Sequence, residues 1–223
     1  MMVLHHCISA RSFRPLWLLE ELGLPYRLVV HPFPPRVRVP EFRDINPLGT
    51  VPAFFDGNLR MTESVAICQY IASRHAPGAL EVSANEADFG AYLNWLHFGE
   101  ATLTFPQTLV LRYERFEPPE RRLPRVADDY RRWFLSRLRA VDDAVGQSPF
   151  LCAERFTLAD ISVGYAVYLA EQIGLEAAMS DAVRGYGRRL WERSGFQRAL
   201  RAQVEAAEAQ GVSTQAAATL DLN

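Results

Sequence analysis

The chain has 223 residues and a formal net charge of −2, and 49% of its residues are hydrophobic and 22% charged. This composition is typical of globular proteins and excludes the disordered, collagen-like and coiled-coil classes, while the length favours two domains. The small net charge argues against nucleic acid or an anionic membrane surface as a partner, and no apolar run reaches the roughly 20 residues of a membrane-spanning helix.

The pattern of residues 3–30 predicts two parallel strands joined by a helix. Residues 3–7 are predicted to form a short strand, and a helical run over 13–22 ends at Gly23, where glycine allows a left-handed stop. Pro15 is tolerated because its missing N–H lies in the first helical turn. Residues 26–30 then form a second strand, which gives a right-handed strand-helix-strand unit.

Turn signals divide the next fifty residues. The proline-rich segment 31–40 predicts a surface loop, because proline neither continues a helix nor pairs within a central strand. Residues 50–55 predict a third strand, and the Asp-Gly pair at 56–57 turns the chain back into 59–61 as a hairpin. An amphipathic helix follows over 63–75.

The chain changes character at residues 76–84, and everything beyond is predicted to be helical. The pattern Ser83-x-x-Glu86 is that of a capping box, which predicts the start of a long helix there. Pro106 is expected to kink or break this helix.

A second capping box is formed by Thr157 and Asp160, three residues apart at the start of an apolar helix. Further helices are predicted over residues 119–145, 181–193 and 196–209. The last segment, 212–223, lacks periodicity and is predicted to be a disordered tail. The fold class is therefore an α/β domain followed by an all-helical domain.

The three cysteines are Cys7, Cys68 and Cys152, which form no CxxC or metal-binding pattern. An odd number of widely spaced cysteines predicts buried free thiols in a reducing compartment, without a disulfide or a structural metal. With no signal-peptide pattern at the start, a cytoplasmic location is expected.

Three motifs in this order resemble the cytosolic glutathione S-transferase family: the segment 46–52 (NPLGTVP), Glu63-Ser64, and the segment 156–160 (FTLAD). The chain is similar to bacterial-type, serine-like members. The resemblance implies a thioredoxin-like, glutathione-binding domain over 1–78 and an all-helical, substrate-binding domain over 84–211.

Glutathione as co-substrate needs donors for its carboxylates, an acceptor for its amine and an unpaired backbone edge. The helix that opens at Ser64 offers N–H groups and a positive dipole end to a carboxylate, and Glu63 is a candidate acceptor for the amine. The alternative is that these residues only cap the helix. The resemblance implies a cis bond before Pro52, with Thr50 and Val51 beside the cysteinyl backbone.

Two arginines of the proline-rich loop, Arg36 and Arg38, are candidates for binding the glycyl carboxylate through charge-assisted hydrogen bonds. The alternative for either residue is an ordinary solvated side chain.

The residue that activates the thiol is harder to assign, because the segment 7–12 has no tyrosine and places alanine where theta-like members carry serine. Ser9 is the first choice, since it aligns with the first serine of zeta-like members. Arg11 and Ser12 are the alternatives, and Ser12 is also a candidate N-cap of the following helix.

Aromatic and apolar residues of the second domain are expected to line the site of a small, apolar electrophile: Trp95, Phe105, Leu109 and Tyr113. The implied activity is that of a transferase typical of detoxification. The alternatives are a glutathione-dependent isomerase and a noncatalytic glutathione-binding or regulatory protein.

The resemblance also implies a homodimer. Four residues are candidates for its contact face: Met61, Tyr70, Phe89 and Tyr92.

Overall fold

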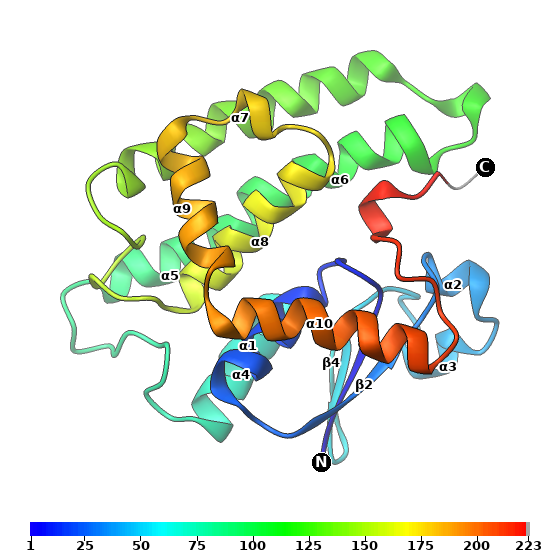
Figure 1. Cartoon of the computed structure of the whole chain (residues 1–223), viewed down its shortest axis with the longest axis horizontal. Coiled ribbons are helices and arrows are strands. Elements are labelled where there is room, and N and C mark those ends of the chain that lie inside the picture. The colour runs from blue at the N-terminus through cyan, green and yellow to red at the C-terminus, as the bar shows by residue number, and fades with distance from the viewer. Residues whose placement is uncertain (222–223) are drawn as a thin grey trace. The chain divides into compact units, whose positions relative to one another are not determined.

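The computed structural model describes residues 1–221, which form two compact units (Figure 1). The N-terminal unit comprises Met1–Glu81 together with Trp191–Ala217. The helical unit comprises Val82–Leu190 together with residues 218–221.

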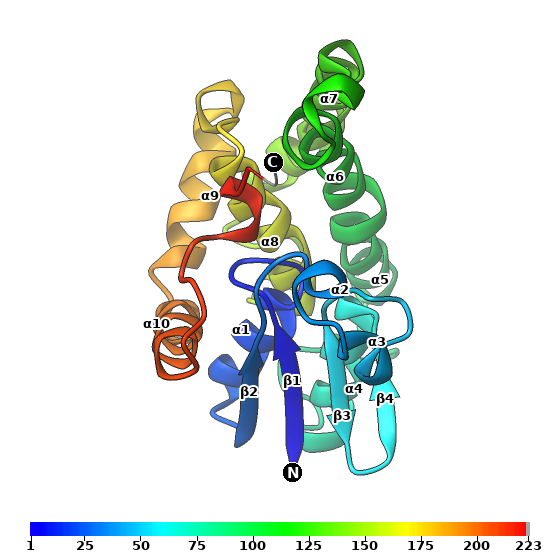
Figure 2. The same ribbon diagram turned by 90° about the vertical axis from the view of Figure 1, so that its right-hand side faces the viewer.

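The N-terminal unit contains a four-stranded sheet in the order β2-β1-β3-β4 (Figure 2). Its strands are β1 (Met2–His6), β2 (Tyr26–Val30), β3 (Ala53–Asp56) and β4 (Leu59–Met61). Its helices are α1 (Phe13–Leu22), α2 (Pro35–Arg38), α3 (Phe42–Ile45), α4 (Ser64–His75) and α10 (Ser194–Ala209). Strands β1 and β2 are parallel and the other neighbours antiparallel, so the predicted strand-helix-strand unit and hairpin are confirmed.

Local signals account for these elements. Helix α1 ends at Gly23, whose φ of 62° is the left-handed stop predicted from the sequence. The hairpin turns at Gly57, where φ is also positive. The proline-rich loop differs from the expectation, because it contains helix α2. Pro35 opens this short helix at its first position, where a missing N–H breaks no helical bond.

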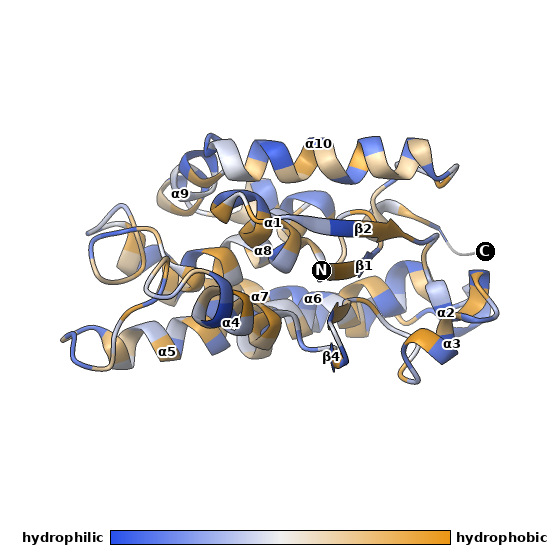
Figure 3. Cartoon of the chain, turned by 90° about the horizontal axis from the view of Figure 1, so that it is seen from below, coloured by the Kyte–Doolittle hydropathy of each residue, from blue (hydrophilic) through white to orange (hydrophobic). Residues whose placement is uncertain are grey.

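Helix α10 belongs to the N-terminal unit, although the sequence divides the chain near residues 78–84. It packs on α1 and β2. Phe196 lies edge-on to Phe13 and to Trp17, with ring centroids 5.4 and 5.0 Å apart, and the Arg193 guanidinium pairs with both Glu21 oxygens. Helix α10 carries both hydrophilic and hydrophobic residues (Figure 3), and its buried residues, Phe196 and Ala199 among them, face the core.

The helical unit contains α5 (Phe89–His97), α6 (Phe105–Leu111), α7 (Pro124–Val145), α8 (Leu158–Gln172) and α9 (Asp181–Trp191). Wider or tighter helical turns are η1 (Phe98–Thr104), η2 (Arg112–Phe116), η3 (Pro119–Arg121), η4 (Glu176–Ala178) and η5 (Ala217–Thr219). Helix α7 begins at Pro124 rather than at 119, because the proline pair 118–119 forms a 3-10 turn instead.

Pro106 does not break the helical run 89–116. The preceding residues, η1, adopt π-helical hydrogen bonding, and Pro106 lies in the first turn of α6, where its lack of an N–H is tolerated. Gly99 in η1 lies against Ser162 of α8, and a Cβ there would come within 2.4 Å of the Ser162 hydroxyl.

The capping box predicted at Thr157 is confirmed. Asp160 is completely buried and accepts the Thr157 backbone N–H at 2.8 Å, while Thr157 Oγ1 accepts the N–H of Ala159 at 3.2 Å. Burial raises the pKa of the Asp160 carboxyl to about 6. The box thus anchors α8, the core helix of this unit.

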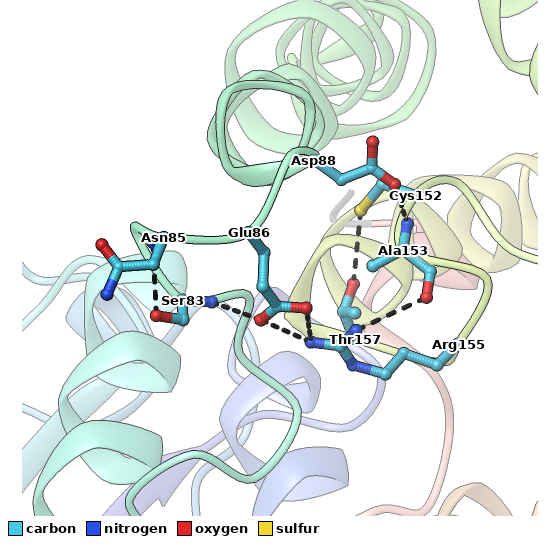
Figure 4. Close-up of polar contacts among 8 residues, drawn as sticks. All are labelled: Ser83, Asn85, Glu86, Asp88, Cys152, Ala153, Arg155 and Thr157. Atoms are coloured by element: carbon cyan, nitrogen blue, oxygen red, sulfur yellow. Dashed lines mark hydrogen bonds and ion pairs between the residues drawn. The ribbon is translucent and has the colours of Figure 1, made fainter.

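The helix expected at Ser83 begins instead at Phe89. Glu86 accepts the Ser83 N–H at 2.7 Å, but the Ser83 hydroxyl accepts from Asn85 in a local turn, so only half of a capping box forms. Arg155 pairs with Glu86 at 2.8 Å and holds this turn against the loop before α8 (Figure 4). A tertiary ion pair thereby replaces the predicted helical turn.

Residues 212–221, expected to be disordered, make defined contacts. The Ala217 N–H donates to the Ile8 carbonyl at 2.9 Å within the N-terminal unit. Within the helical unit, the Arg115 guanidinium donates to the Ala218 carbonyl and Arg122 pairs with Asp221. Backbone hydrogen bonds and charge pairing therefore supply the order that apolar periodicity does not. Residues 222–223 lie outside the described part of the chain.

Across residues 1–221, no helix is long and apolar enough to cross a membrane.

Candidate functional site

The loop between β1 and α1 carries the candidate thiol-activating residues. Ser9 has a φ of 55°, which is left-handed backbone, and only 3% of it is exposed. Arg11 is half-buried, and Ser12 is completely buried. Hydrogen bonds from Ala10 to Cys7 and from Phe13 to Ala10 close the loop as tight turns.

Ser12 stands at the N-cap position of α1, but its side chain makes no cap hydrogen bond. Its hydroxyl lies 2.8 Å from His6 Nδ1 and accepts the Cys7 N–H at 3.4 Å. The capping interpretation of Ser12 is therefore wrong, because a buried imidazole on β1 engages the hydroxyl in place of the helix backbone.

Ser9 is bound by Gln203 of α10. Gln203 Oε1 accepts the Ser9 backbone N–H at 2.9 Å, and Gln203 Nε2 donates to Ser9 Oγ at 3.3 Å. Gln203 Oε1 also lies 3.0 Å from His6 Nε2. Burial lowers the pKa of His6 to about 4, so the ring is neutral at pH 7.

The turn before β3 is held by Asn46, which is 1% exposed. Its side chain donates to the Thr50 carbonyl at 2.7 Å and accepts the Leu48 N–H at 3.1 Å. The bond between Val51 and Pro52 is cis. Among residues 1–221, no hydrogen bond occupies the Val51 N–H or carbonyl, so this backbone edge is open to a ligand.

The sheet register places the open Val51 backbone near the candidate thiol-activating loop, residues 7–12. His5 pairs with Ala53 where β1 and β3 run antiparallel, so the end of β1 and the start of β3 share one edge of the sheet. The loop at 7–12 and the turn at 50–52 leave the sheet at this edge.

The first turn of α4 adds polar groups. Glu63 is exposed at the N-cap position, and within the described part of the chain its carboxylate has no hydrogen bond or ion pair. Ser64 is 4% exposed, and its hydroxyl oxygen accepts from Arg14 Nη1 at 3.1 Å. The Ser64 hydrogen is therefore available to an acceptor, and the buried Arg14 guanidinium adds positive charge to that of the helix terminus.

The two loop arginines are exposed on α2. The Arg36 side chain lies against Gly49, where an added Cβ would come within 2.7 Å of Arg36 Cβ. Gly49 also has a φ of +67°, so both the close approach and the backbone conformation require glycine in this turn. Arg36 is thus fixed against the turn that leads to Val51. Arg38 lies two residues further along the same short helix.

In the helical unit, the candidate electrophile residues lie along the run 89–116. Trp95 is on α5, Phe105 and Leu109 are on α6, and Tyr113 is on η2. Phe105 is 53% exposed, and the other three are partly buried. The spacing of four residues from Phe105 to Leu109 and on to Tyr113 places these three on one side of a helical run.

Of the four residues proposed for a dimer face, Tyr92 is 2% exposed and belongs to the interior. It therefore offers no contact surface, which corrects the prediction for this residue. Met61, Tyr70 and Phe89 are partly exposed.

The cysteines are unsuited to act as nucleophiles. Burial raises the pKa of the Cys7 thiol well above its ordinary value, that of Cys68 to about 12 and that of Cys152 to about 11. Within residues 1–221, no group of three or more His, Cys, Asp or Glu side chains is placed to hold a metal ion.

Three of these site groups escaped the sequence interpretation: Arg14, His6 and Gln203. Arg14 and His6 lie beside predicted site residues, but an arginine in a helix and a histidine in a strand give no local sign of their partners. Gln203 is 194 residues from Ser9 and carried no signal at all.

The sequence of this chain is similar to that of known proteins. A family profile described as the N-terminal domain of glutathione S-transferases matches residues 8–74. A glutathione S-transferase of Hyoscyamus muticus is 31% identical over 170 residues, which cover 69% of this chain and 74% of that protein. Glutathione S-transferase 3 of Schizosaccharomyces pombe is 34% identical over 103 residues, 46% of this chain but only 43% of that relative's length.

Among solved structures, Ure2p5 from Phanerochaete chrysosporium, cocrystallized with 1-(S-glutathionyl)-2,4-dinitrobenzene, matches with a TM-score of 0.78 at 22% identity. The match covers 93% of this chain and 96% of that one. A likeness at this identity establishes a shared fold.

Proposed function

The chain belongs to the glutathione S-transferase family, and from that premise we propose that it binds glutathione and activates its thiol for attack on small, apolar electrophiles. Its fold is that of the family, a thioredoxin-like sheet followed by a helical domain. The observation that carries the proposal is the open backbone of Val51, which follows the turn held by Asn46. The same unit also presents Glu63 at a helix N-terminus.

Each polar part of glutathione finds a matching group in the N-terminal unit. Val51 pairs with the cysteinyl backbone, beside Thr50 and Pro52. Ser64 and the first N–H groups of α4 bind the γ-glutamyl carboxylate, and Arg14 strengthens this anion site by its charge.

The remaining groups of glutathione take charged partners. Glu63 accepts from the amine, and Arg36 or Arg38 binds the glycyl carboxylate. Arg36 is the better placed of the two arginines, because its stem is fixed over Gly49.

We expect Glu63→Ala to weaken glutathione binding at least tenfold, because a hydrogen bond between charged groups contributes roughly 1.5–3 kcal/mol. Calorimetric titration of the purified chain measures this effect. Glu41→Ala is the matched control, since Glu41 is also an exposed glutamate at an N-cap position, on α3. Equal affinities for wild type and Glu63→Ala would remove Glu63 from the site.

The electrophile is proposed to contact Trp95, Phe105, Leu109 and Tyr113. An apolar surface of this kind discriminates poorly between substrates, by about 1–3 kcal/mol per methylene group. Turnover assays with an aryl halide and several other electrophiles, run beside glutathione calorimetry, test the assignment. Glutathione binding without any turnover would favour the noncatalytic alternative, and turnover only of an isomerisable substrate would favour the isomerase.

A homodimer is also proposed, with Met61, Tyr70 and Phe89 as candidate contact residues. Light scattering at micromolar concentration is expected to give about twice the chain mass of 25.2 kDa. A mass of one chain throughout that range would contradict the dimer.

We further propose a cytoplasmic location. All three cysteines are buried free thiols in the structure, which is the state that a reducing compartment maintains.

A further inference from the structure

Two buried histidines join the sheet to the segment that follows it. His5 lies on β1 and His31 directly after β2; each is 9% exposed, and His5 Nδ1 lies 2.8 Å from His31 Nε2. The ring planes differ by only 11°, and the ring centroids are 5.1 Å apart, further than the two nitrogens by about one ring width. The rings therefore lie end to end in nearly one plane, as a direct hydrogen bond between imidazoles requires.

This histidine pair anchors helix α3. Phe42, the completely buried first residue of α3, packs edge-on against both rings, with centroid distances of 4.9 Å to His31 and 6.5 Å to His5. Phe55 of β3 packs edge-on against His5 at 5.6 Å. Helix α3 ends at Asn46, whose side chain holds the turn before β3. The pair thus holds α3, and with it the Asn46 turn, on the sheet.

The hydrogen bond between the rings limits how many protons the pair can carry. A neutral imidazole has one N–H and one bare nitrogen, so either ring can donate to the other. One added proton can go to the outer nitrogen of the donor ring and leave the bond intact. A second proton must go to the accepting nitrogen, which would set two N–H groups and two positive charges against each other across 2.8 Å.

No negative charge compensates the pair. Within residues 1–221, no hydrogen bond or ion pair joins either ring to a carboxylate. The charges that act on the rings are positive, from Arg27 on β2 and from His6 on β1 when it is protonated. Helix α3 carries Arg43 and Asp44, both exposed to solvent.

The surroundings therefore favour the neutral rings. Burial, the neighbouring His31 and the charge of Arg27 lower the pKa of His5 to about 4, and burial lowers the pKa of His31 as well. In a released segment both rings would return to the ordinary histidine pKa of about 6.5. The stabilisation by the pair is then complete above pH 6.5 and is lost as the pH falls toward about 4.

We propose that the His5–His31 pair is a pH-sensitive switch, which holds α3 and the Asn46 turn on the sheet near neutral pH and releases them on acidification. Release would displace the Val51 backbone that follows this turn. That consequence for glutathione rests on the proposed function, whereas the switch itself does not.

Amide hydrogen exchange of the ligand-free chain, at about pH 7.5 and about pH 5 and corrected for the intrinsic effect of pH, measures the release. The reporters are the His31 N–H, which donates to the His6 carbonyl, and the Asn46 N–H, which donates to the Phe42 carbonyl. We expect their protection to fall at least about thirtyfold at the lower pH, the change that the lowered pKa of His5 alone produces.

The Leu24 N–H is the internal reference, since it donates to the Leu19 carbonyl at the end of α1 in the same unit. Its protection should change less than about threefold. Equal loss at Leu24 and at the reporters would mean that the whole unit unfolds, and unchanged protection at His31 and Asn46 would mean that nothing is released. Either result overturns the switch.

A double variant, His5→Asn with His31→Gln, removes both titratable rings but can retain a hydrogen bond, because the two amides place polar atoms near those of the ring nitrogens. Its protection at Asn46 should no longer depend on pH. His75→Gln is the matched control: His75 Nε2 bonds Asp56 Oδ2 at 2.8 Å at the end of α4, so this variant should keep the pH dependence of wild type.

Nitrogen-15 shifts of His5 and His31 in wild type give a readout that needs no variant, should the double variant fail to fold. Both rings are expected to stay neutral at about pH 6, and a pKa near 6.5 for either ring overturns the switch. Glutathione calorimetry at about pH 7.5 judges the proposed function separately. Absence of binding there would overturn that function and leave the exchange result standing.

Discussion

Replacement of Asp160 by alanine is expected to lower the free energy of unfolding by about 3–5 kcal/mol, the range for removing the acceptor from buried polar groups. Asp160 is completely buried, and its two carboxylate oxygens accept from Thr157 N–H at 2.8 Å, Leu151 N–H at 3.1 Å and the Tyr186 hydroxyl at 3.0 Å. The substitution leaves these donors unpaired in the interior. The sequence alone predicts only the capping box, worth roughly 1–2 kcal/mol.

Urea or thermal unfolding of wild type and Asp160→Ala measures this loss. Asp181→Ala is the matched control, because Asp181 also lies in the first turn of a helix but has a 96% exposed side chain, which among residues 1–221 pairs with Arg184 alone. Its effect should stay below about 1 kcal/mol. Glutathione affinity of folded Asp160→Ala should remain near that of wild type. A small loss of stability with a large loss of affinity would mean that Asp160 belongs to the binding site.

Replacement of Ser9 by alanine is expected to raise the pKa of the bound glutathione thiol by about one to two units. A shift of two units corresponds to about 2.7 kcal/mol of differential stabilisation, which one hydroxyl donor together with the N-terminus of α1 can supply. A free thiol of pKa ~8.5 is only about 3% ionised at pH 7, so kcat/KM at neutral pH should fall roughly ten- to thirtyfold. At high pH, where the thiol ionises unaided, the loss should disappear.

Thiolate absorbance against pH measures this change for Ser9→Ala, Ser12→Ala and Arg11→Ala. Ser9 has a φ of 55°, a left-handed conformation in which serine and alanine both carry a Cβ, so Ser9→Ala leaves this backbone strain in place. Ser9→Gly relieves the strain, since glycine adopts this conformation freely, and it shows whether the thiol pKa depends on the strain. Both Ser9 variants should shift the thiol pKa alike. If Ser9→Ala titrates like wild type while Arg11→Ala or Ser12→Ala moves upward by a unit or more, that other residue activates the thiol.

Local sequence signals were sufficient to predict those elements whose ends depend on a few neighbouring residues. Helix α1 ends at Gly23, the β3–β4 hairpin turns at an Asp-Gly pair, α4 begins at Ser64, and α8 begins after the Thr157 cap, as predicted. These features follow from backbone dihedral preferences and hydrogen bonds within one turn, which are the same in any tertiary context. Glu63 was proposed from its place next to a helix start, and Val51 from the resemblance to the family; both assignments stay predictions.

Features that depend on distant partners follow from contacts between segments and were not predicted. The helix expected at Ser83 begins at Phe89, because Arg155 binds Glu86 across the unit. Ser12 binds His6 and does not cap its helix. Gln203 reaches Ser9 and His6 only because Phe196 and the other apolar residues of α10 pack on α1. Side-chain packing between segments nearly 200 residues apart fixes the donors and acceptors of the site, and no local pattern encodes it.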